Sequence, residues 1–287
     1  WEKQEGILHE NEAAEILYRI SADIHMHGSD IKEGKIELIA DCDGVLKIRR
    51  DALLAVNSLG EMMIASRHGD FPVKKGDKIA GTRIIPLVIE KSKMDKAEKV
   101  AGTKPIFSIL PYRSKKVGII TTGSEVQKGL IKDTFTPVLK EKLDEFSCQI
   151  LGQTLPGDER SQITSDILSF IDQGADMVIC SGGMSVDPDD RTPGAIKDTG
   201  AEIVTYGAPV LPGAMLLLSY YQNNDKIIPI LGLPGCVMYA RRTVFDLILP
   251  RIMADDRICA DEIASYGEGG LCLNCDVCTF PNCGFGK

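Results

Sequence analysis

From Lys116 onward, short apolar runs alternate with helical stripes, and this alternation limits the possible fold more than any other feature. Residues 117–121, 149–153 and 177–180 have the length of buried strands, and the segments between them carry apolar side chains at helical spacing. Parallel strands joined in this way need right-handed crossovers and a sheet that is covered on both faces. The sequence therefore predicts a three-layer, doubly wound α/β domain with a mostly parallel sheet.

The remaining elements of this domain follow the same alternation. Asp158 stands before a helical stripe and is the expected N-cap of that helix, because a carboxylate there can accept backbone N–H bonds. The expected helices cover residues 135–146, 163–171, 193–198 and 237–252, and the further strands cover residues 202–204, 215–218 and 227–231.

The first part of the chain has short strands and Gly-Asp turns without regular alternation. Asp43-Gly44 lies between the strand patterns 36–40 and 45–48 and predicts a tight hairpin, while the charged segment 90–99 is expected to connect elements. We expect three regions: a smaller strand-rich N-terminal domain over residues 1–114, the α/β domain over 115–256, and a linker with a cysteine-rich tail over 257–287. Because Trp1 is not an initiator Met, we expect the first domain to be truncated at its start.

Composition excludes several classes of protein. The net charge of −8 argues against a nucleic-acid surface, which is normally basic. No apolar run approaches the ~20 residues that a transmembrane helix needs, so we expect no membrane partner. No apolar signal segment is visible, and cysteines are scattered outside the tail as in a reducing compartment, so a cytoplasmic location is expected; these cysteines are Cys42, Cys148, Cys180, Cys236 and Cys259.

Four glycine-rich segments lie next to predicted strand ends, where open α/β sheets bind ligands. They are residues 121–125, 181–185 with the acids that follow, 211–213 and 233–235. Glycines let backbone amides approach a phosphate or a flat ring, and hydroxyl groups donate hydrogen bonds to it. Acidic side chains can hold a divalent ion. Each segment alone is more simply a turn or a solvated helix start. Their convergence at one sheet edge predicts a binding crevice.

Two common nucleotide-binding motifs are absent from the sequence. There is no G-x-G-x-x-G after the first strand of the α/β domain, so a dinucleotide fold is unsupported. There is also no G-x-x-x-x-G-K-[ST], which removes the P-loop hydrolases.

Segments 121–125 (TTGSE), 181–193 (SGGMSVDPDDRTP) and 233–235 (LPG), in this order, resemble the molybdopterin-binding domain of molybdenum cofactor biosynthesis proteins. That domain is shared by molybdopterin molybdotransferases and adenylyltransferases, and the resemblance covers roughly residues 116–254. It implies binding of molybdopterin or its adenylylated form, a role in molybdenum or tungsten cofactor biosynthesis, and homo-oligomers.

The resemblance also implies roles for particular residues. Asp190, rather than Asp187, matches the acid that handles Mg²⁺ or molybdate, and Glu125 is expected to assist it. The implied cofactor-binding residues are Thr122, Gly123, Ser124, Glu125, Gly182, Gly183, Ser185, Pro212, Gly213, Pro234 and Gly235.

The chain departs from the family pattern at several of these positions. Ser124 replaces a common acid, Ala214 stands where a basic residue is frequent, and Cys236-Val237 replaces Asn-Pro. The N-terminal region also lacks the D-N-S-A-M-D-G-Y segment of molybdotransferases. These losses affect catalysis more than pterin binding.

Three functions therefore remain open. The chain is an enzyme that inserts the metal into the pterin, or a non-catalytic carrier or sensor of the finished cofactor whose tail reports metal or redox state. The third function is a nucleotide-salvage hydrolase on the same fold. The expected partners of the first two are the pterin itself and a molybdoenzyme or an assembly protein.

The tail carries a second, separate motif. Cys272, Cys275, Cys278 and Cys283 read C-x2-C-x2-C-x4-C, a spacing at which four thiolates can wrap one metal centre. Either an iron–sulfur cluster or zinc fits the pattern, and a thiol-rich segment that orders on a partner is the alternative. Gly267, Gly269 and Gly270 precede the motif and predict a flexible joint to a separable tail.

Overall fold

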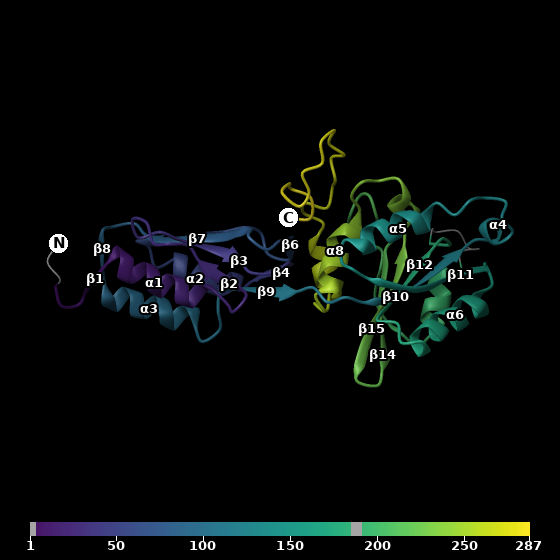
Figure 1. The fold of residues 1–287 in the computed structure, drawn as a ribbon, viewed down its shortest axis with the longest axis horizontal. Helices are drawn as coiled ribbons and strands as arrows, with labels where there is room; N and C mark the ends of the chain where they lie inside the picture. Colours follow the sequence, from purple (N-terminus) through teal and green to yellow (C-terminus); the bar gives the residue numbers. More distant parts are fainter. Residues whose placement is uncertain (1–3, 185–190) are drawn as a thin grey trace. The chain divides into compact units, whose positions relative to one another are not determined.

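The computed structural model describes residues 4–184 and 191–287 and divides into two compact units, Trp1–Tyr112 and Arg113–Lys287 (Figure 1). Within the described ranges, no helix is both long and apolar enough to cross a membrane.

The N-terminal unit combines antiparallel sheets with three helices that share one core. Its core includes Leu17, Leu38, Leu46 and Met94, all of which are fully buried. The sheets are β2 (Met26–Gly28)–β3 (Ile36–Ala40)–β7 (Lys78–Ile84)–β5 (Met62–Ser66), β6 (Phe71–Val73)–β4 (Gly44–Ile48)–β9 (Phe107–Pro111) and β1 (Ile7–His9)–β8 (Val88–Glu90); the helices are α1 (Glu10–Ser21), α2 (Arg50–Asn57) and α3 (Lys91–Ala101).

The predicted hairpin at Asp43-Gly44 is wrong, because β3 and β4 belong to different sheets. Gly44 pairs with Val73 and Pro111, and a Cβ at Gly44 would lie 2.3 Å from the carbonyl oxygen of Leu110. The glycine thus permits a close approach of β4 to β9. The Asp43 carboxylate accepts a bond from the Lys75 backbone N–H at 2.7 Å instead of closing a turn.

The charged segment 90–99 forms most of helix α3 and is not a simple connection. Met94, Ala97 and Ala101 are completely buried on one side of this helix. Spacings of three and four residues place them on one stripe, so three apolar contacts are enough to anchor an otherwise charged helix.

The C-terminal unit has a six-stranded sheet, which confirms the predicted doubly wound α/β fold. The first four strands in spatial order are parallel to one another, and β14 runs antiparallel to both of its neighbours. The order is β11 (Gln149–Gly157), β10 (Lys116–Thr122), β12 (Met177–Ser181), β15 (Lys226–Leu233), β14 (Leu217–Asn223) and β13 (Glu202–Tyr206).

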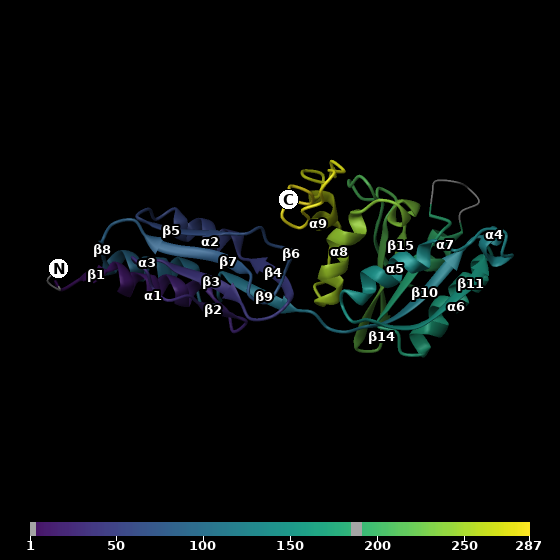
Figure 2. The ribbon, with the colours of Figure 1, turned by 45° about the horizontal axis from the view of Figure 1, so that its top comes forward.

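Helices cover both faces of this sheet. Ile163, Ile167, Phe170 and Ile171 of α6 (Arg160–Asp172) are buried, as their spacing predicts, and they share a core cluster with residues of α7 (Thr192–Asp198). Figures 1 and 2 show α5 (Phe135–Asp144) and α8 (Val244–Met253) on the opposite side of the sheet from α6. The three-layer arrangement follows.

Two local predictions in this unit are corrected. Asp158 does not cap α6; the N-cap is Glu159, and the Asp158 carboxylate accepts the Ser124 backbone N–H at 2.9 Å. The last helix is also shorter than residues 237–252. The chain first makes the 3-10 turn η1 (Gly235–Met238) and begins α8 only after Thr243, whose side chain accepts the Phe245 N–H. The capping box of Thr243 and Asp246 provides this later start.

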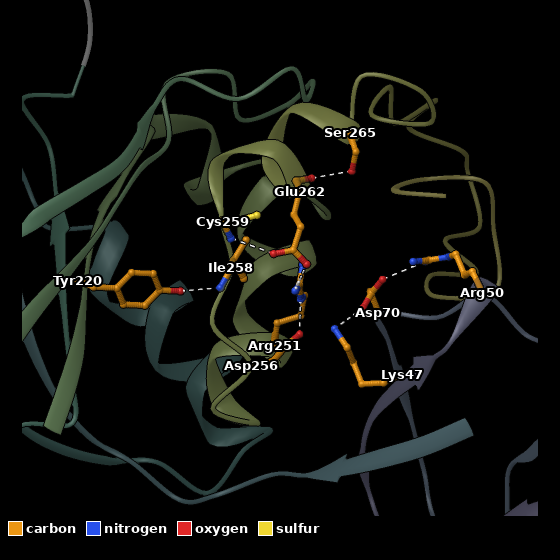
Figure 3. A network of polar contacts seen from close by, with 10 residues as sticks. All are labelled: Lys47, Arg50, Asp70, Tyr220, Arg251, Asp256, Ile258, Cys259, Glu262 and Ser265. Carbon is orange, nitrogen blue, oxygen red and sulfur yellow. Dashed lines mark hydrogen bonds and ion pairs between the residues drawn. The ribbon is translucent and has the colours of Figure 1, made fainter. Parts of the chain in front are cut away.

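Residues after Met253 are held by a buried network that Figure 3 shows. The Arg251 side chain is 2% exposed and donates to Asp256 and to Glu262, both at 2.6 Å. Glu262 belongs to helix α9 (Ala260–Ser265), and the nearby Ile258 N–H donates to the Tyr220 hydroxyl at 3.0 Å. The predicted linker is therefore structured.

The expected flexible joint before the cysteine motif is wrong. A Cβ at Gly269 would lie 2.0 Å from the Lys287 carbonyl oxygen, and one at Gly270 would lie 2.3 Å from that of Tyr266. The Leu211 N–H donates to the Gly270 carbonyl, and the Cys272 N–H donates to the Leu211 carbonyl, both at 2.8 Å. The hydrogen bonds of Leu211 with Gly270 and Cys272 thus join the tail to the sheet domain.

Candidate functional site

The carboxyl ends of three neighbouring strands lie in register and define what we call the carboxyl edge. Thr121 of β10 is opposite Ser181 of β12, and Ser181 is opposite Leu233 of β15. Three of the predicted binding segments follow directly from these residues. The fourth, with Pro212 and Gly213, precedes β14, whose first residue Leu217 pairs with Gly232. The topology thus brings all four segments to one edge.

A hydroxyl pair joins two of these segments. The Thr122 hydroxyl donates to the Ser181 carbonyl at 3.2 Å and lies 3.2 Å from the Thr192 hydroxyl, which donates to the Gly182 carbonyl at 2.9 Å. Gly182 and Gly183 have φ of +85° and +54°, a region that favours glycine. A Cβ at Gly182 would lie 2.6 Å from the Thr122 carbonyl oxygen. Packing alone therefore explains glycine at position 182.

The turn after β10 is fixed from a second side. Gly123 has φ of +123°, and its N–H donates to the Gly157 carbonyl at 3.2 Å. The Ser124 N–H donates to Asp158, and Glu125 follows, exposed, in the short helix α4 (Ser124–Gln127). A side chain at position 123 would have open space, because a Cβ there would have only the Val126 side chain within 4 Å, at a distance of 3.8 Å.

The two Leu-Pro-Gly segments differ in their surroundings. Gly213 has φ of +127°, and a Cβ there would lie 2.5 Å from the Val244 side chain, so this glycine is needed where the chain contacts the start of α8. The Pro212 carbonyl accepts the Val244 N–H at 3.1 Å. Gly235 is exposed, and a Cβ there would meet only Met238 at 3.8 Å. The space beside Gly235 is open to a ligand.

A polar cluster lies beneath the edge, behind β10. Gln153 donates to Thr121 at 3.0 Å, to Thr136 at 2.7 Å and to Asp133 at 2.7 Å. Partial burial acts to raise the pKa of Asp133, but hydrogen bonds from Thr136 and Gln153 outweigh burial and lower that pKa. Asp133 is therefore a fixed negative charge that orders the strand and α5.

Ser185 and Asp190 lie outside the described residues, as do Asp187 and Asp189, so their predicted roles stay predictions. Sequence reasoning missed Thr192, although it belongs to the quoted segment 181–193, because a helix-initiating hydroxyl gives no distinct signal. It also missed the contact of Asp158 with Ser124, because a carboxylate before a helical stripe more often caps the helix.

A cavity of about 500 Å³ lies at the opposite end of the strands. Lys115, Asp176 and Lys226 line it, next to the first residues of β10, β12 and β15. Partial burial acts to raise the pKa of Asp176, but hydrogen bonds from Lys226 and from the Lys116 N–H lower it. Lys226 pairs with Asp176, and Lys115 pairs with Asp255. Because the cavity lies at the starts of the strands, it is not at the edge where the motif residues gather.

The four tail cysteines line a separate cavity of about 280 Å³ together with Arg241 and Arg242. All four are free thiols. In the ranges 4–184 and 191–287, no three His, Cys, Asp or Glu side chains are grouped so that they could hold one metal ion. The backbone N–H of Phe280, assisted by Arg242, lowers the pKa of the Cys278 thiol.

The glycine-rich turns gather at the carboxyl edge of a doubly wound sheet, which is the edge where open α/β sheets bind ligands. Residues 118–254 match the family model described as a probable molybdopterin binding domain.

The chain is also similar to curated proteins. It is 27% identical over 236 residues to a molybdopterin molybdenumtransferase of Haemophilus influenzae, covering 79% of this chain and 54% of that protein. It is 25% identical over 193 residues to the corresponding protein of Synechococcus elongatus, covering 64% and 44%. A CinA-like protein of Mycolicibacterium gilvum is 37% identical over 79 residues, covering 28% of this chain and 19% of the relative. The chain spans about half the length of the molybdenumtransferases it matches.

Solved structures with partial similarity include the tungsten cofactor synthesizing protein MoaB from Pyrococcus furiosus, with 17% identity and a TM-score of 0.42, covering 51% of this chain and 99% of that chain. The protein CinA from Thermoplasma acidophilum has 16% identity and a TM-score of 0.38, covering 48% and 98%.

Proposed function

We propose that the carboxyl edge binds molybdopterin, free or adenylylated, and that the protein inserts molybdenum or tungsten into this pterin during cofactor biosynthesis. The observation that carries the proposal is the register of Thr121, Ser181 and Leu233, which brings glycine-rich turns together within a domain of the molybdopterin-binding family. Such turns present backbone donors to phosphate groups.

In this proposal the two kinds of glycine have different roles. Gly182 and Gly183, with Ser185, meet the terminal phosphate, while Thr122 keeps their turn in place through its bonds to Ser181 and Thr192. Gly123 and Gly235 admit the ligand, because the space beside each is open. Ser124, Pro212, Gly213 and Pro234 complete the rim.

The chemical step is the positioning of a metal oxyanion beside the bound pterin. We assign this step to Asp190 and Glu125, with Mg²⁺ as the candidate ion. Glu125 is exposed at the first turn of α4, next to the open space at Gly123, which supports its access to a ligand. A non-catalytic carrier or sensor is the alternative, and the replacements at Ser124, Ala214 and Cys236 favour it.

Equilibrium binding of molybdopterin, compared with ADP on the same full chain, tests the proposal. Molybdopterin should bind more tightly than ADP, and incubation with molybdate should yield a metal-containing pterin. Tight binding without metal transfer would support the carrier, and tighter binding of ADP would contradict pterin binding altogether.

A pair of variants locates the site. Gly235→Val fills the open space at the edge and should weaken molybdopterin binding by at least about ten-fold, since a side chain then occupies the ligand's place. Gly81→Val is the matched control, because a Cβ at Gly81 also has open space, with only Lys35 at 4.0 Å, and lies in the N-terminal unit. Equal affinity of both variants for molybdopterin would remove Gly235 from the site.

A further inference from the structure

The tail cysteines form a constellation that pterin binding does not use. Cys272, Cys275, Cys278 and Cys283 come from a segment of twelve residues and all face one cavity of about 280 Å³. The other side chains that line the cavity include the cations Arg241 and Arg242, the neutral polar residues Asn274 and Thr279, and apolar residues such as Phe280 and Phe285.

The spacing of the thiols favours a cluster over a single ion. Cys272, Cys275 and Cys278 follow the C-x2-C-x2-C spacing of bacterial ferredoxins, in which each cysteine sulfur bonds to an iron atom. Zinc sites with four cysteines more often take them as two separated C-x2-C pairs. Four cysteines that line one cavity suit a group with several iron atoms.

The surroundings supply what such a cluster needs. A cluster with four thiolate ligands is an anion, and the two arginines place positive charge beside it. Arg241 is fixed by donating to the Asp276 carbonyl at 2.8 Å, and the Arg242 guanidinium lies 5.0 Å from the centre of the Phe280 ring. Phe280 and Phe285 pack with ring centres 6.2 Å apart, and an apolar shell of this kind restricts solvent access to a metal centre.

Backbone hydrogen bonds also hold the tail in place. Its first residues form backbone hydrogen bonds with Leu211. The Gly286 N–H donates to the Gly269 carbonyl at 2.9 Å, and this hydrogen bond joins the two ends of the segment. A closed segment whose four cysteines line one cavity loses little conformational entropy when it binds a metal centre.

We propose that Cys272, Cys275, Cys278 and Cys283 bind one iron–sulfur cluster. Each thiol releases its proton to solvent as its sulfur bonds to iron. The iron and sulfide come from outside the chain, as ferrous and ferric iron in equal parts with sulfide, so no further oxidant or reductant is needed.

The test is anaerobic reconstitution of the full chain with this iron mixture and sulfide in the presence of equimolar zinc. Iron and acid-labile sulfide should be retained in equal amounts, at least about two of each per chain, with visible absorption of a cluster. Retention of zinc in place of iron, or of neither metal, would overturn the proposal.

Two variants make the assignment specific. Cys275→Ser should lose most of the bound iron, and because Cys275 is exposed its replacement leaves the core intact, which far-ultraviolet circular dichroism checks. Cys259→Ser is the matched control, since Cys259 is an exposed thiol outside the tail at the N-cap of α9, where serine is well tolerated. Equal iron content in the two variants would show that the cluster is not held by the tail.

Discussion

Gly182 and Gly129 both have positive φ, +85° and +68°, but their surroundings differ. A Cβ at Gly129 would meet nothing within 4 Å, whereas one at Gly182 would lie 2.6 Å from the Thr122 carbonyl oxygen. Any L-residue in this backbone region costs about 1–2 kcal/mol. A comparison of the two positions therefore separates backbone strain from steric conflict.

We expect Gly129→Ala to lower the free energy of unfolding by about 1 kcal/mol and Gly182→Ala to lower it by about 3 kcal/mol, since the second variant must also displace the backbone at Thr122. Urea denaturation followed by circular dichroism measures both. Equal losses would mean that the turn at Gly182 relaxes freely, and its geometry would then be no guide to the ligand site.

Glu262 shows how one element is attached through charge. Partial burial acts to raise the pKa of Glu262, but bonds from the Cys259 N–H and from Arg251 outweigh it, and the pKa is lowered. A carboxyl group whose pKa is lower in the folded state stabilises the protein at pH values above the unfolded pKa of about 4.3. This contribution is lost as the pH falls through the folded pKa.

The Glu262→Gln variant should therefore be less stable than the wild type at pH 7, and the difference should shrink as the pH falls below about 4. Because the Glu262 side chain is 37% exposed, solvent screening limits the difference to less than about 1 kcal/mol. Denaturant titrations of both proteins across this pH range measure it. A difference that persists unchanged at low pH would assign the effect to packing and not to charge.

At the level of elements, the sequence predicts most accurately where the pattern is long and regular. The α6 stripe from Ile163 to Ile171 is buried as expected, because four apolar residues at helical spacing lie on one face of the helix and only that face can pack against the core. The helix α3 has only Met94, Ala97 and Ala101 on its buried side, and its charges conceal them.

Pairings between distant strands are harder to predict than the strands themselves. Asp43-Gly44 has the local composition of a hairpin turn, but Gly44 is opposite Pro111, which is far away in the sequence. The same limit applies to the site. Strand ends locate Thr122, Gly182 and Gly235, whereas the Thr122–Thr192 contact joins residues that are 70 positions apart, a pairing that composition does not specify.

At the level of the whole molecule, the tail is part of the C-terminal unit. Leu211, from one of the rim segments, exchanges backbone bonds with Gly270 and Cys272, and Arg241, which follows the other rim segment, donates to Asp276. Phe285 is 4% exposed, so the end of the chain contributes to a packed region. These contacts favour a tail whose removal affects the stability of the C-terminal unit.

We therefore expect deletion of residues 271–287 to destabilise the C-terminal unit by about 2 kcal/mol, from the lost backbone bonds and the lost Arg242–Phe280 contact. The midpoint of thermal unfolding should fall by roughly 4–8 °C for a unit of this size, measured by calorimetry on reduced, metal-free protein so that a bound cluster does not contribute. Phe280→Ala should reproduce part of the shift. Val277→Ser is the control, because Val277 is 77% exposed and its replacement should leave the midpoint unchanged. An unchanged midpoint after the deletion would show that the tail contacts carry no stability, and that its only role lies in what the four cysteines bind.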